Sequence, residues 1–467
     1  MTLDVTTFID AKGGNAEEIR VSQKKRYASV ELVDEIIQMY QDWVKMDYET
    51  NQMSKATNAI QKEITAKRKA KENADELIAD KAKLDAEIAG NKKKVAEAEV
   101  AMRAKAATVG NLVYKDVPVS DDEDNNGIVR TWHPDGPNGQ VQKKDNEILP
   151  HHEVMHCIDA VDLERGTKIM GHRGYFLIND GLDLNQALIS YGLDFLRKRN
   201  YRRIQTPFMM KKDMMSKTAQ LSQFDEELYK VTGDEDDKYL IATSEQPISA
   251  LHSDEWFDQP QTQLPIRYAG YSTCFRKEAG SHGKDTWGIF RVHQFEKLEQ
   301  FCITAPEKSW EMFNDMVATS EAFYQSLGLP YRLVAIVSGA LNNAAAMKYD
   351  LEAWFPYQGA YKELVSTSNC TDYQSRRLEI RYGLKQKGDS KKVYVHMLNG
   401  TLCATERAMC CLVENYQDEN GMRIPEVLQP YMQGRTHIPW VKTQPKGSTT
   451  VKKIQLAEPA AVEAPKL

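Results

Sequence analysis

Apolar side chains follow a heptad-like spacing through much of the first quarter of the chain. In one series the steps are seven, four, seven, seven and seven residues, through Leu77, Leu84, Ile88, Val95, Met102 and Val109. A looser series precedes it, through Leu32, Ile36, Tyr40, Trp43, Met53, Ile60 and Ile64. Residues 15–89 contain neither Gly nor Pro, the two strongest helix breakers. Together these patterns predict long helices that pack along an apolar seam.

A polar and basic segment at residues 65–73 separates the two series. Because each seam needs a partner to cover it, we expect an antiparallel helical hairpin over about residues 27–110. Each helix would have about 40 residues and, at ~1.5 Å per residue, a length of roughly 60 Å. The hairpin alone could serve simply as a solvated spacer, so its purpose must come from other features of the chain.

The middle of the sequence mixes strand-like and helix-like patterns. Strands are expected at 264–275, 288–301, 331–337 and 361–367, and amphipathic helices at 185–198, 307–327 and 405–416. Several strands follow one another without a helix between each pair, which favours an antiparallel sheet and an α+β fold.

Composition suggests where the domains begin and end. We divide the chain into an N-terminal domain (1–116), an acidic linker that contains Gly and Pro (117–150), a second domain (151–442) and a disordered tail (443–467). The tail is assigned as disordered because it contains few large hydrophobic residues.

The net charge of −6 is divided unevenly along the chain. As a whole it argues against a uniformly basic nucleic-acid-binding protein. Residues 51–110, however, carry 13 Lys or Arg against 9 Asp or Glu. The densest basic spot lies between the two seams, at Lys67, Arg68, Lys69 and Lys71. A charge run is usually just a solvated face, so by itself it is weak evidence for RNA.

Several classes of protein are disfavoured by missing motifs. The seven cysteines include no C-x-x-C pair, which suits a reducing compartment such as the cytoplasm and argues against disulfides and against zinc. The histidines at 151, 152 and 156 stand close together, but imidazoles in a row do not by themselves give tetrahedral metal geometry. No apolar run approaches the ~20 residues that span a bilayer, so no membrane partner is expected. There is no G-x-x-x-x-G-K-[ST] loop and no G-x-G-x-x-G after a strand.

Residues 274–300 carry the most informative polar pattern. Cys274-Phe-Arg-Lys-Glu-Ala-Gly280 and residues 287–300 read as two strands joined by a polar loop at 279–286. In the second strand, alternation places five side chains on one face, namely Arg291, His293, Phe295, Lys297 and Glu299. Cations, an aromatic ring and a carboxylate on one strand face are hard to explain by packing, so this face predicts a binding site. We expect Lys297 and Glu299 to point at different neighbours rather than to pair.

These residues resemble motif 2 of the class II aminoacyl-tRNA synthetases, in the form found in seryl-tRNA synthetases. Other segments match the same family in the same order. The helix from Asn185 with Ile204-Gln-Thr-Pro207 resembles the dimer-forming motif 1, and Thr243-Ser-Glu245 resembles the serine-recognition loop. Residues 363–376 also match, and 396–407 resemble motif 3, although Leu402 and Ala404 stand where Gly is common. The likeness covers all but the final tail and is to a eukaryotic cytosolic member.

The resemblance implies a fold and a reaction. It implies an antiparallel-sheet class II catalytic domain with an N-terminal tRNA-binding coiled-coil arm. It also implies a serine–tRNA ligase, which activates L-serine with ATP to seryl-adenylate and transfers the seryl group to the 3′ end of tRNA(Ser). The implied cofactors are ATP and magnesium, the implied partners tRNA(Ser) and a second copy of the chain, and no zinc is expected.

Residue roles follow from the resemblance alone. The implied catalytic residues are Arg276 and Arg407. Serine binding is assigned to Thr243, Ser244, Glu245, Arg276, Glu299, Asn399 and Thr401, with the hydroxyl on Glu299. ATP binding is assigned to Arg276, Lys277, Glu278, Arg291, Val292, Phe295, Glu363, Leu364, Val365, Ser366 and Arg407. Glu363 and Ser366 would ligate magnesium, Lys67, Arg68, Lys69 and Lys71 would contact tRNA, and Pro207 would belong to the dimer motif.

Two other functions remain as alternatives at this point. One is a catalytically inactive, synthetase-like RNA-binding protein, which would have no reason to retain Arg276, Glu299, Glu363 and Arg407 together. The other is a structural coiled-coil protein with a folded head. Neither alternative predicts serine-dependent exchange of pyrophosphate into ATP.

Overall fold

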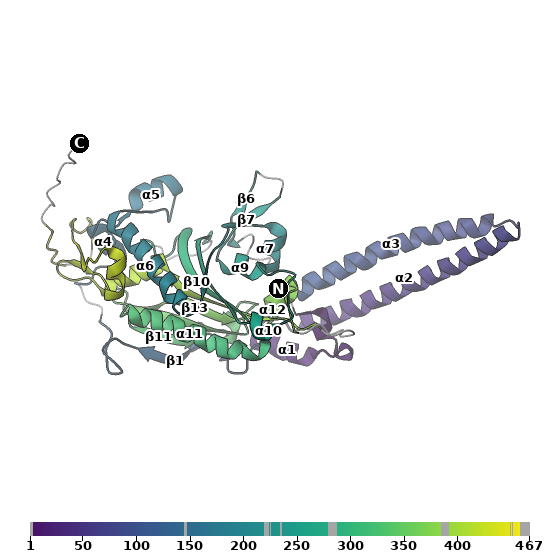
Figure 1. Cartoon of the computed structure of the whole chain (residues 1–467), viewed down its shortest axis with the longest axis horizontal. Helices are drawn as coiled ribbons and strands as arrows, with labels where there is room; N and C mark the ends of the chain where they lie inside the picture. Colours follow the sequence, from purple (N-terminus) through teal and green to yellow (C-terminus); the bar gives the residue numbers. More distant parts are fainter. Residues whose placement is uncertain are drawn as a thin grey trace. The chain divides into compact units, whose positions relative to one another are not determined.

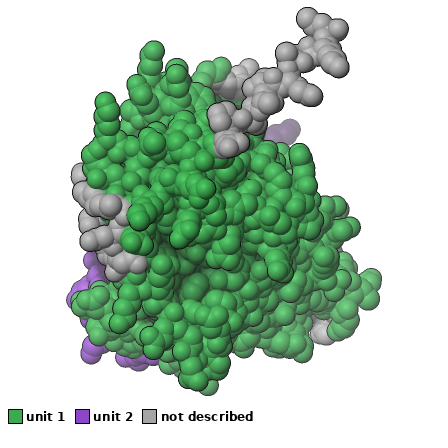
Figure 2. Space-filling view, turned by 90° about the vertical axis from the view of Figure 1, so that its left-hand side faces the viewer, with its two compact units in different colours: residues 1, 114–467 green, residues 2–113 purple. Residues whose placement is uncertain are grey.

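The chain forms two compact units. The computed structural model describes residues 3–143, 147–218, 224, 226–233, 236–278, 287–383, 392–448, 450 and 452–457. Unit 2 comprises residues 2–113, and unit 1 comprises residue 1 and residues 114–467. Figure 2 colours unit 1 green and unit 2 purple. No helix in the described part of the chain is long and apolar enough to cross a membrane.

Unit 2 is dominated by two long antiparallel helices (Figure 1). They are α2 (Glu31–Lys69) and α3 (Asp75–Ala106). The side chains that they bury against each other come from the predicted seams and include Ile36, Ile64, Ile88 and Met102. The helical arm expected from the heptad spacing is therefore confirmed. At 39 residues and ~1.5 Å per residue, α2 is about 58 Å long.

The absence of Gly and Pro did not produce one unbroken helix before the arm. A separate helix, α1 (Ala16–Lys25), ends before α2 begins at Glu31. Tyr27 between them adopts a left-handed conformation with φ of 54°. The Ser29 hydroxyl donates a hydrogen bond of 2.8 Å to the carboxylate of Glu31 at the start of α2. Helix α1 ends in a Schellman-type turn, in which the amides of Tyr27 and Ala28 donate to the carbonyls of Lys24 and Gln23 without a Gly or Pro.

Unit 1 is built on an eight-stranded sheet with the strand order β1-β11-β12-β13-β15-β10-β9-β4. In that order the strands are Gly127–Trp132, Tyr331–Ala335, Met347–Phe355, Ala360–Asn369, His396–Ala404, Gln294–Thr304, Ile266–Phe275 and Arg202–Gln205. All neighbours pair antiparallel except β4 and β9, which are parallel. The expected α+β fold with an antiparallel sheet is confirmed.

Three helices cover one face of this sheet: α6 (Asn179–Arg197), α11 (Ser309–Ser326) and α13 (Thr405–Asn415). Leu298 of β10 points to this side and packs against Gly192 of α6. A Cβ atom added to Gly192 would lie only 2.3 Å from the Leu298 Cδ1 atom. Gln300, on the same face of β10, donates to the Met316 carbonyl of α11 at 3.2 Å. Even-numbered residues of β10 therefore face the helices, and odd-numbered residues face the opposite side.

Smaller elements complete unit 1. The short helices are α4 (His151–Cys157), α5 (Leu163–Met170), α7 (Lys212–Thr218), α9 (Glu245–Ala250), α10 (Pro260–Gln263) and α12 (Tyr373–Leu378). The short strands are β2 (Val161–Asp162), β3 (Phe176–Leu177), β5 (Met209–Lys211), β6 (Lys230–Val231), β7 (Lys238–Leu240), β8 (Trp256–Phe257), β14 (Arg381–Tyr382), β16 (Gly421–Arg423) and β17 (His437–Pro439).

Two segments differ from the sequence-based expectation. Strand β1 lies within residues 117–150, which composition suggested to be a linker, and it pairs with β11 at one edge of the sheet. Six strand residues in an otherwise polar segment are too few to be recognised by composition.

Beyond residue 442, the described residues also make contacts that the expected disorder did not include. Ser448 donates to Glu153 at 2.6 Å, and the amide of Ala457 donates to the Trp440 carbonyl at 2.9 Å. These hydrogen bonds connect the described residues of the segment to the rest of unit 1, whereas residues 458–467 of the expected tail lie outside the described residues.

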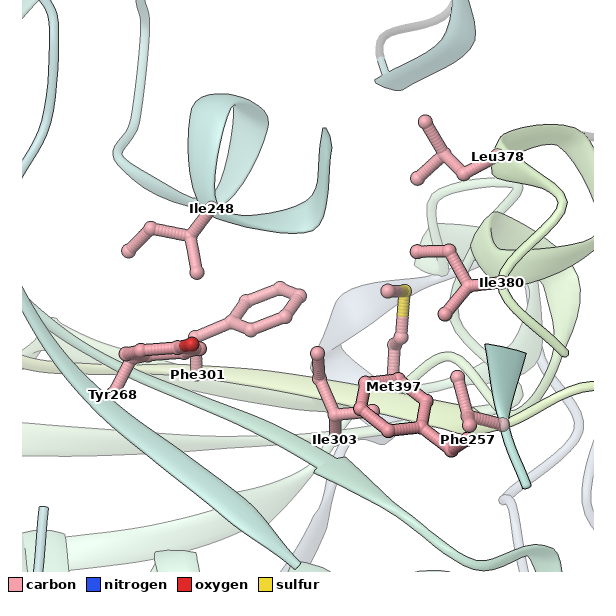
Figure 3. Packing of buried hydrophobic residues seen from close by; sticks show 9 residues of the cluster. Ile248, Phe257, Tyr268, Phe301, Ile303, Leu378, Ile380 and Met397 are labelled. Carbon is pink, nitrogen blue, oxygen red and sulfur yellow. The ribbon is translucent and has the colours of Figure 1, made fainter. Parts of the chain in front are cut away.

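A core cluster lies on the odd-numbered side of β10, below α9 (Figure 3). Ile248 of α9 points toward Tyr268 of β9 and Phe301 of β10, and Ile303 and Met397 continue the cluster along the sheet. Phe301 and Ile303 are fully buried. This cluster supports the segment from which α9 starts.

We expect Phe301→Ala to destabilise unit 1 by about 3–5 kcal/mol, because it removes a fully buried ring and leaves a cavity. Urea unfolding followed by circular dichroism would measure the loss. Leu251→Ala, at a side chain that is 47% exposed, is the matched control and should change the free energy of unfolding by much less. Equal losses for both variants would contradict the assignment of this cluster as core.

Candidate functional site

The odd-numbered side of β10 opens into a cavity of about 410 Å³. Strands β10, β12, β13 and β15, the segment after β9, the loop before β10, the start of α9 and the start of α13 all contribute to it. Fourteen of the residues assigned to serine, ATP or magnesium line it: Thr243, Glu245, Arg276, Glu278, Arg291, Val292, Phe295, Glu299, Glu363, Leu364, Ser366, Asn399, Thr401 and Arg407. Residues far apart in sequence therefore meet in one cavity.

Three assigned residues do not line the cavity. Ser244 is fully buried and packs closely against Gly270 of β9. A Cβ atom added to Gly270 would lie 2.9 Å from the Ser244 hydroxyl, so only glycine allows this approach. Val365 is also buried. Lys277 has its backbone amide bonded to the Glu227 carbonyl at 3.0 Å. The loop at 279–286 lies outside the described residues.

The residues assigned to tRNA and to the dimer lie elsewhere. Lys67, Arg68 and Lys69 are exposed in the last turn of α2, and Lys71 is exposed in the turn that follows, in unit 2. Pro207 is exposed and follows β4, the last strand at one edge of the sheet. An edge strand has unpaired backbone groups on one side, which another chain can use.

Cations and aromatic rings line one part of the cavity. The guanidinium of Arg276 lies 5.3 Å from the ring centroid of Phe295. That of Arg407 lies 4.9 Å from the ring of Phe290 and donates to the carbonyls of Phe290 and Glu363, each at 3.3 Å. These bonds hold Arg407 in place from the first turn of α13. The arrangement offers two fixed cations and flat apolar surfaces, as an anionic ligand with an aromatic ring requires.

Arg291 lines the cavity as expected, but it does not lie in a strand, as the sequence pattern predicted. The sequence placed the strand at 288–301, whereas β10 begins at Gln294. Arg291 therefore reaches the cavity from the preceding loop, where its Nε lies 3.7 Å from Glu278 Oε2. Arg173 lies equally close to the same oxygen and was not predicted. It comes from the turn before β3, whose sequence has no periodic pattern that would indicate a site.

Carboxylates and hydroxyls gather in the other part of the cavity. Lys297 forms an ion pair with Glu299 Oε2 and donates to the Thr243 hydroxyl at 2.8 Å. The expectation that Lys297 and Glu299 would point at different neighbours is wrong. Both lie on one face of β10, and the flexible lysine side chain bends back to the carboxylate two residues away. Both are almost fully buried, so pairing avoids an isolated buried charge.

Glu245, the first residue of α9, faces this group from the other side of the cavity. Its Oε1 accepts hydrogen bonds from Gln374 at 2.7 Å and from Asn399 at 3.0 Å. Burial, followed by the nearby Glu299 carboxylate, raises the pKa of Glu245 to about 7. A cationic group placed between the two carboxylates would stabilise the ionised form.

Glu363 and Ser366 on β13 provide oxygen atoms at the edge of the cavity. Partial loss of hydration raises the pKa of Glu363, whose side chain is 49% exposed, but Arg407, Lys348 and Arg276 outweigh this effect and leave that pKa below its ordinary value. The carboxylate is thus ionised at neutral pH. Among the described residues, no cluster of three or more His, Cys, Asp or Glu could hold a metal. A hard cation here would need further oxygen ligands from a substrate.

Glu406 was not assigned a role from sequence, although it precedes Arg407. It is almost fully buried and accepts from the Tyr175 hydroxyl at 2.9 Å and from the Glu296 amide at 3.0 Å. Burial, followed by the Glu296 carboxylate, raises the pKa of Glu406 to about 8. These bonds join α13 to β10, so Glu406 anchors the helix turn from which Arg407 projects.

Comparisons with known proteins agree with this arrangement. Two family models match the chain: the tRNA synthetase class II core domain (G, H, P, S and T) at residues 229–416 and the seryl-tRNA synthetase N-terminal domain at residues 2–113. The cytoplasmic serine–tRNA ligase of Schizosaccharomyces pombe is 59% identical, over 96% of this chain and 99% of that protein. The cytoplasmic enzyme of Saccharomyces cerevisiae is also 59% identical, over 96% and 98%.

Solved structures show the same similarity. The cytoplasmic serine–tRNA ligase of Naegleria fowleri in complex with AMP has a TM-score of 0.82 and 50% identity, over 94% of this chain and 99% of that one. The seryl-tRNA synthetase of Pyrococcus horikoshii complexed with ATP has a TM-score of 0.84 and 35% identity, over 94% and 100%.

The raised pKa of Glu406 predicts a pH-dependent stability. From its ordinary value of 4.5 up to about 8, the folded chain holds a proton on Glu406 that the unfolded chain releases. The free energy of unfolding should therefore fall as pH rises through this window, by at most ~1.4 kcal/mol per pH unit. Glu406→Gln cannot ionise and should flatten the fall, as measured by urea unfolding at pH 5.5 and 8.

The matched control for this prediction is Glu311→Gln, at a side chain that is 75% exposed. It should leave the pH dependence as in the unaltered chain. If Glu406→Gln shows the same decline as the unaltered chain between pH 5.5 and 8, Glu406 does not hold its proton in the fold.

Proposed function

The chain belongs to the family of cytoplasmic serine–tRNA ligases, and from this premise we propose how its own residues perform the reaction. In the first step the carboxylate of serine attacks the α-phosphorus of ATP, which gives seryl-adenylate and releases pyrophosphate. In the second step the terminal adenosine of tRNA(Ser) takes the seryl group on its 3′-hydroxyl. The cytoplasm is the site of action, as in the relatives named above.

The first step brings an anionic nucleophile against a polyanion, so catalysis depends on placed cations. Arg276 interacts electrostatically with both Glu245 and Glu363, and it would bind the α-phosphate together with the serine carboxylate. Its planar guanidinium can bind both with paired donors, which a lysine could not do as well. Arg407 would hold the γ-phosphate and Arg291 the bent triphosphate from the other side.

The adenine would bind against Phe295, beside the guanidinium of Arg276. Glu278 would accept a hydrogen bond from the adenine amino group. Arg173 and Arg291 both lie 3.7 Å from Glu278 Oε2 and support this carboxylate in the cavity. Glu278 has a backbone φ of 50°, in the left-handed region. This conformation costs energy for a residue other than glycine, so the surrounding contacts must stabilise it.

Serine would be held by three kinds of contact. Its ammonium group would bind Glu245, its carboxylate Arg276, and its hydroxyl Glu299, with Thr243, Asn399 and Thr401 completing the pocket. A buried Glu299 without a hydroxyl partner is costly, so alanine and glycine should be rejected strongly. Threonine has the hydroxyl and must be excluded by the size of the pocket, which is a weaker discrimination.

Magnesium would be held by Glu363 and Ser366 together with phosphate oxygens of ATP. The ionised state of Glu363 and the all-oxygen set fit a hard cation. Bound there, the ion would neutralise charge on the phosphates. Arg276, Arg291 and Arg407 would bind and orient the triphosphate from the protein side.

The arm would bind tRNA, and the exposed edge of the sheet would bind a second copy of the chain. Two long helices with exposed Lys67, Arg68, Lys69 and Lys71 could lie along the tRNA backbone and recognise its shape. Binding should then weaken with salt. The exposed strand β4 with Pro207 supports a homodimer through this edge.

One observation carries the proposal: Arg276, Arg407, Glu245 and Glu299 line a single cavity of about 410 Å³, although they are distant in sequence. The test is pyrophosphate exchange into ATP, which reports adenylate formation alone. We expect exchange with serine, less with threonine and almost none with alanine. No serine-dependent exchange by the full chain would contradict the function and favour an inactive RNA-binding protein.

Arg276→Ala is the variant that belongs to this test. We expect it to lower exchange by at least ~10³-fold while the thermal unfolding midpoint stays near that of the unaltered chain, because the charge on the α-phosphate loses its partner. Arg165→Ala, at an exposed arginine on α5, is the control. Exchange within tenfold of the unaltered rate would refute the role of Arg276.

Shortening the arm should separate the two steps. The amide of Asn91 donates to the sulfur of Met53 at 3.3 Å, so residues 51 and 90 lie near the same height on α2 and α3. Deletion of residues 51–90, with a short glycine connection, should leave exchange within about twofold but reduce charging of tRNA(Ser) by ~10²-fold or more. The expectation rests on the loss of phosphate contacts. Undiminished charging would remove the arm from the mechanism.

A further inference from the structure

Lys297 is a buried cation in the serine part of the cavity to which none of the roles above is assigned. Its side chain is 8% exposed, and that of Glu299 is 2% exposed. Burying an ammonium group costs free energy unless the group is fully paired. The buried position of Lys297 therefore indicates a specific role. The role of Lys297 rests on the proposed function, in which Glu299 binds the serine hydroxyl.

The hydrogen bonds around Lys297 fix the orientation of two neighbouring groups. The Thr243 hydroxyl accepts from Lys297 Nζ at 2.8 Å and from the Glu245 amide at 3.3 Å, and it donates to Glu299 Oε2 at 3.4 Å. Both lone pairs and the proton of this hydroxyl are therefore used. Glu299 Oε2 in turn receives both Lys297 and Thr243.

The second oxygen of Glu299 is left for the substrate. Within the described part of the chain, no residue donates a hydrogen bond to Oε1, although Glu299 lines the cavity. Because Oε2 is held at two points, a flip of the carboxylate would break both contacts, which leaves Oε1 as the oxygen available to a ligand hydroxyl.

The charges of the pocket also balance only when Lys297 is counted. The charged and titratable groups that face it are Glu299 on β10, Glu245 on α9, and Cys274 and Arg276 on and after β9, while β15 presents the neutral Asn399 and Thr401. Two carboxylates thus meet two cations. A serine zwitterion is neutral, so with Arg276 taking its carboxylate and Glu245 its ammonium, Lys297 is left to neutralise Glu299.

We propose that Lys297 is a positioning residue for serine selection, which holds Oε2 of Glu299 and the Thr243 hydroxyl so that an ionised Glu299 presents Oε1 to the substrate hydroxyl. The same ammonium keeps the two carboxylates from sharing a proton. Serine is therefore preferred over alanine through a carboxylate that Lys297 orients, although Lys297 itself does not touch the substrate.

Lys297→Met tests the proposal, because Met has a similar length but no charge. Lys297 lowers the pKa of Glu245, which must be ionised to bind the ammonium of serine. For the unaltered chain, kcat/KM for serine should rise with pH through about 7. In Lys297→Met this rise should move upward by about one pH unit or more, and the preference for serine over alanine should fall about tenfold or more.

The measurement is pyrophosphate exchange from pH 6 to 8.5 with serine and with alanine. KM for ATP should stay within about twofold, because Lys297 lies in the serine part of the cavity. Lys297→Arg should restore the pH profile, since it returns the positive charge. Lys308→Met is the matched control, since it breaks another lysine–glutamate pair of unit 1, the surface pair of Lys308 with Glu311 at 2.9 Å.

Each outcome distinguishes the role of Lys297 from the function itself. A pH profile of Lys297→Met parallel to that of the unaltered chain, with serine and alanine affected equally, would show a packing role and overturn the proposal. Absence of exchange in the unaltered chain would instead contradict the proposed function. If circular dichroism shows that Lys297→Met does not fold, Lys297→Gln, which is polar and uncharged, takes its place with the same expected shifts.

Discussion

Strand β10 separates the packed side of unit 1 from its reactive side, because successive side chains of a strand point to opposite faces. Leu298 and Gln300 face α6 and α11, and Lys297 and Glu299 face the cavity. A shift of one residue in the pairing with β9 or β15 would exchange the two sets and bury the charges among helices. The register of this strand therefore sets both the stability of the core and the geometry of the site.

The charges of the cavity impose a second constraint. Glu245, Glu299, Lys297 and Arg276 would each be costly if buried alone. Placed together they compensate one another, and a zwitterionic substrate adds no net charge to them. Further along the cavity, Arg407 and Lys348 keep Glu363 ionised. The same pairings that make the site tolerable in a folded protein also orient its groups toward serine and ATP.

The arm and the sheet were predictable to different degrees, for physical reasons. Heptad spacing is a local property, so the seams that include Ile36 and Ile88 identified the arm directly. The start of the arm was placed at about residue 27, whereas α2 begins at Glu31, because backbone hydrogen bonds at Tyr27 rather than a Gly or Pro mark the boundary. Strand β1 was missed because its six residues lie in a polar stretch and are stabilised by pairing with β11.

The sequence by itself determined the class of the protein, because its motifs keep cations, carboxylates and an aromatic ring at family-like spacings. It also indicated most of the residues that line the cavity. Only the tertiary structure decided how these groups pair. The contact between Lys297 and Glu299, the approach of Arg173 to Glu278 and the burial of Glu406 all depend on distances between side chains that spacing along the chain does not set. Such distances arise from the bend of flexible side chains and from strands and helices brought together by the fold.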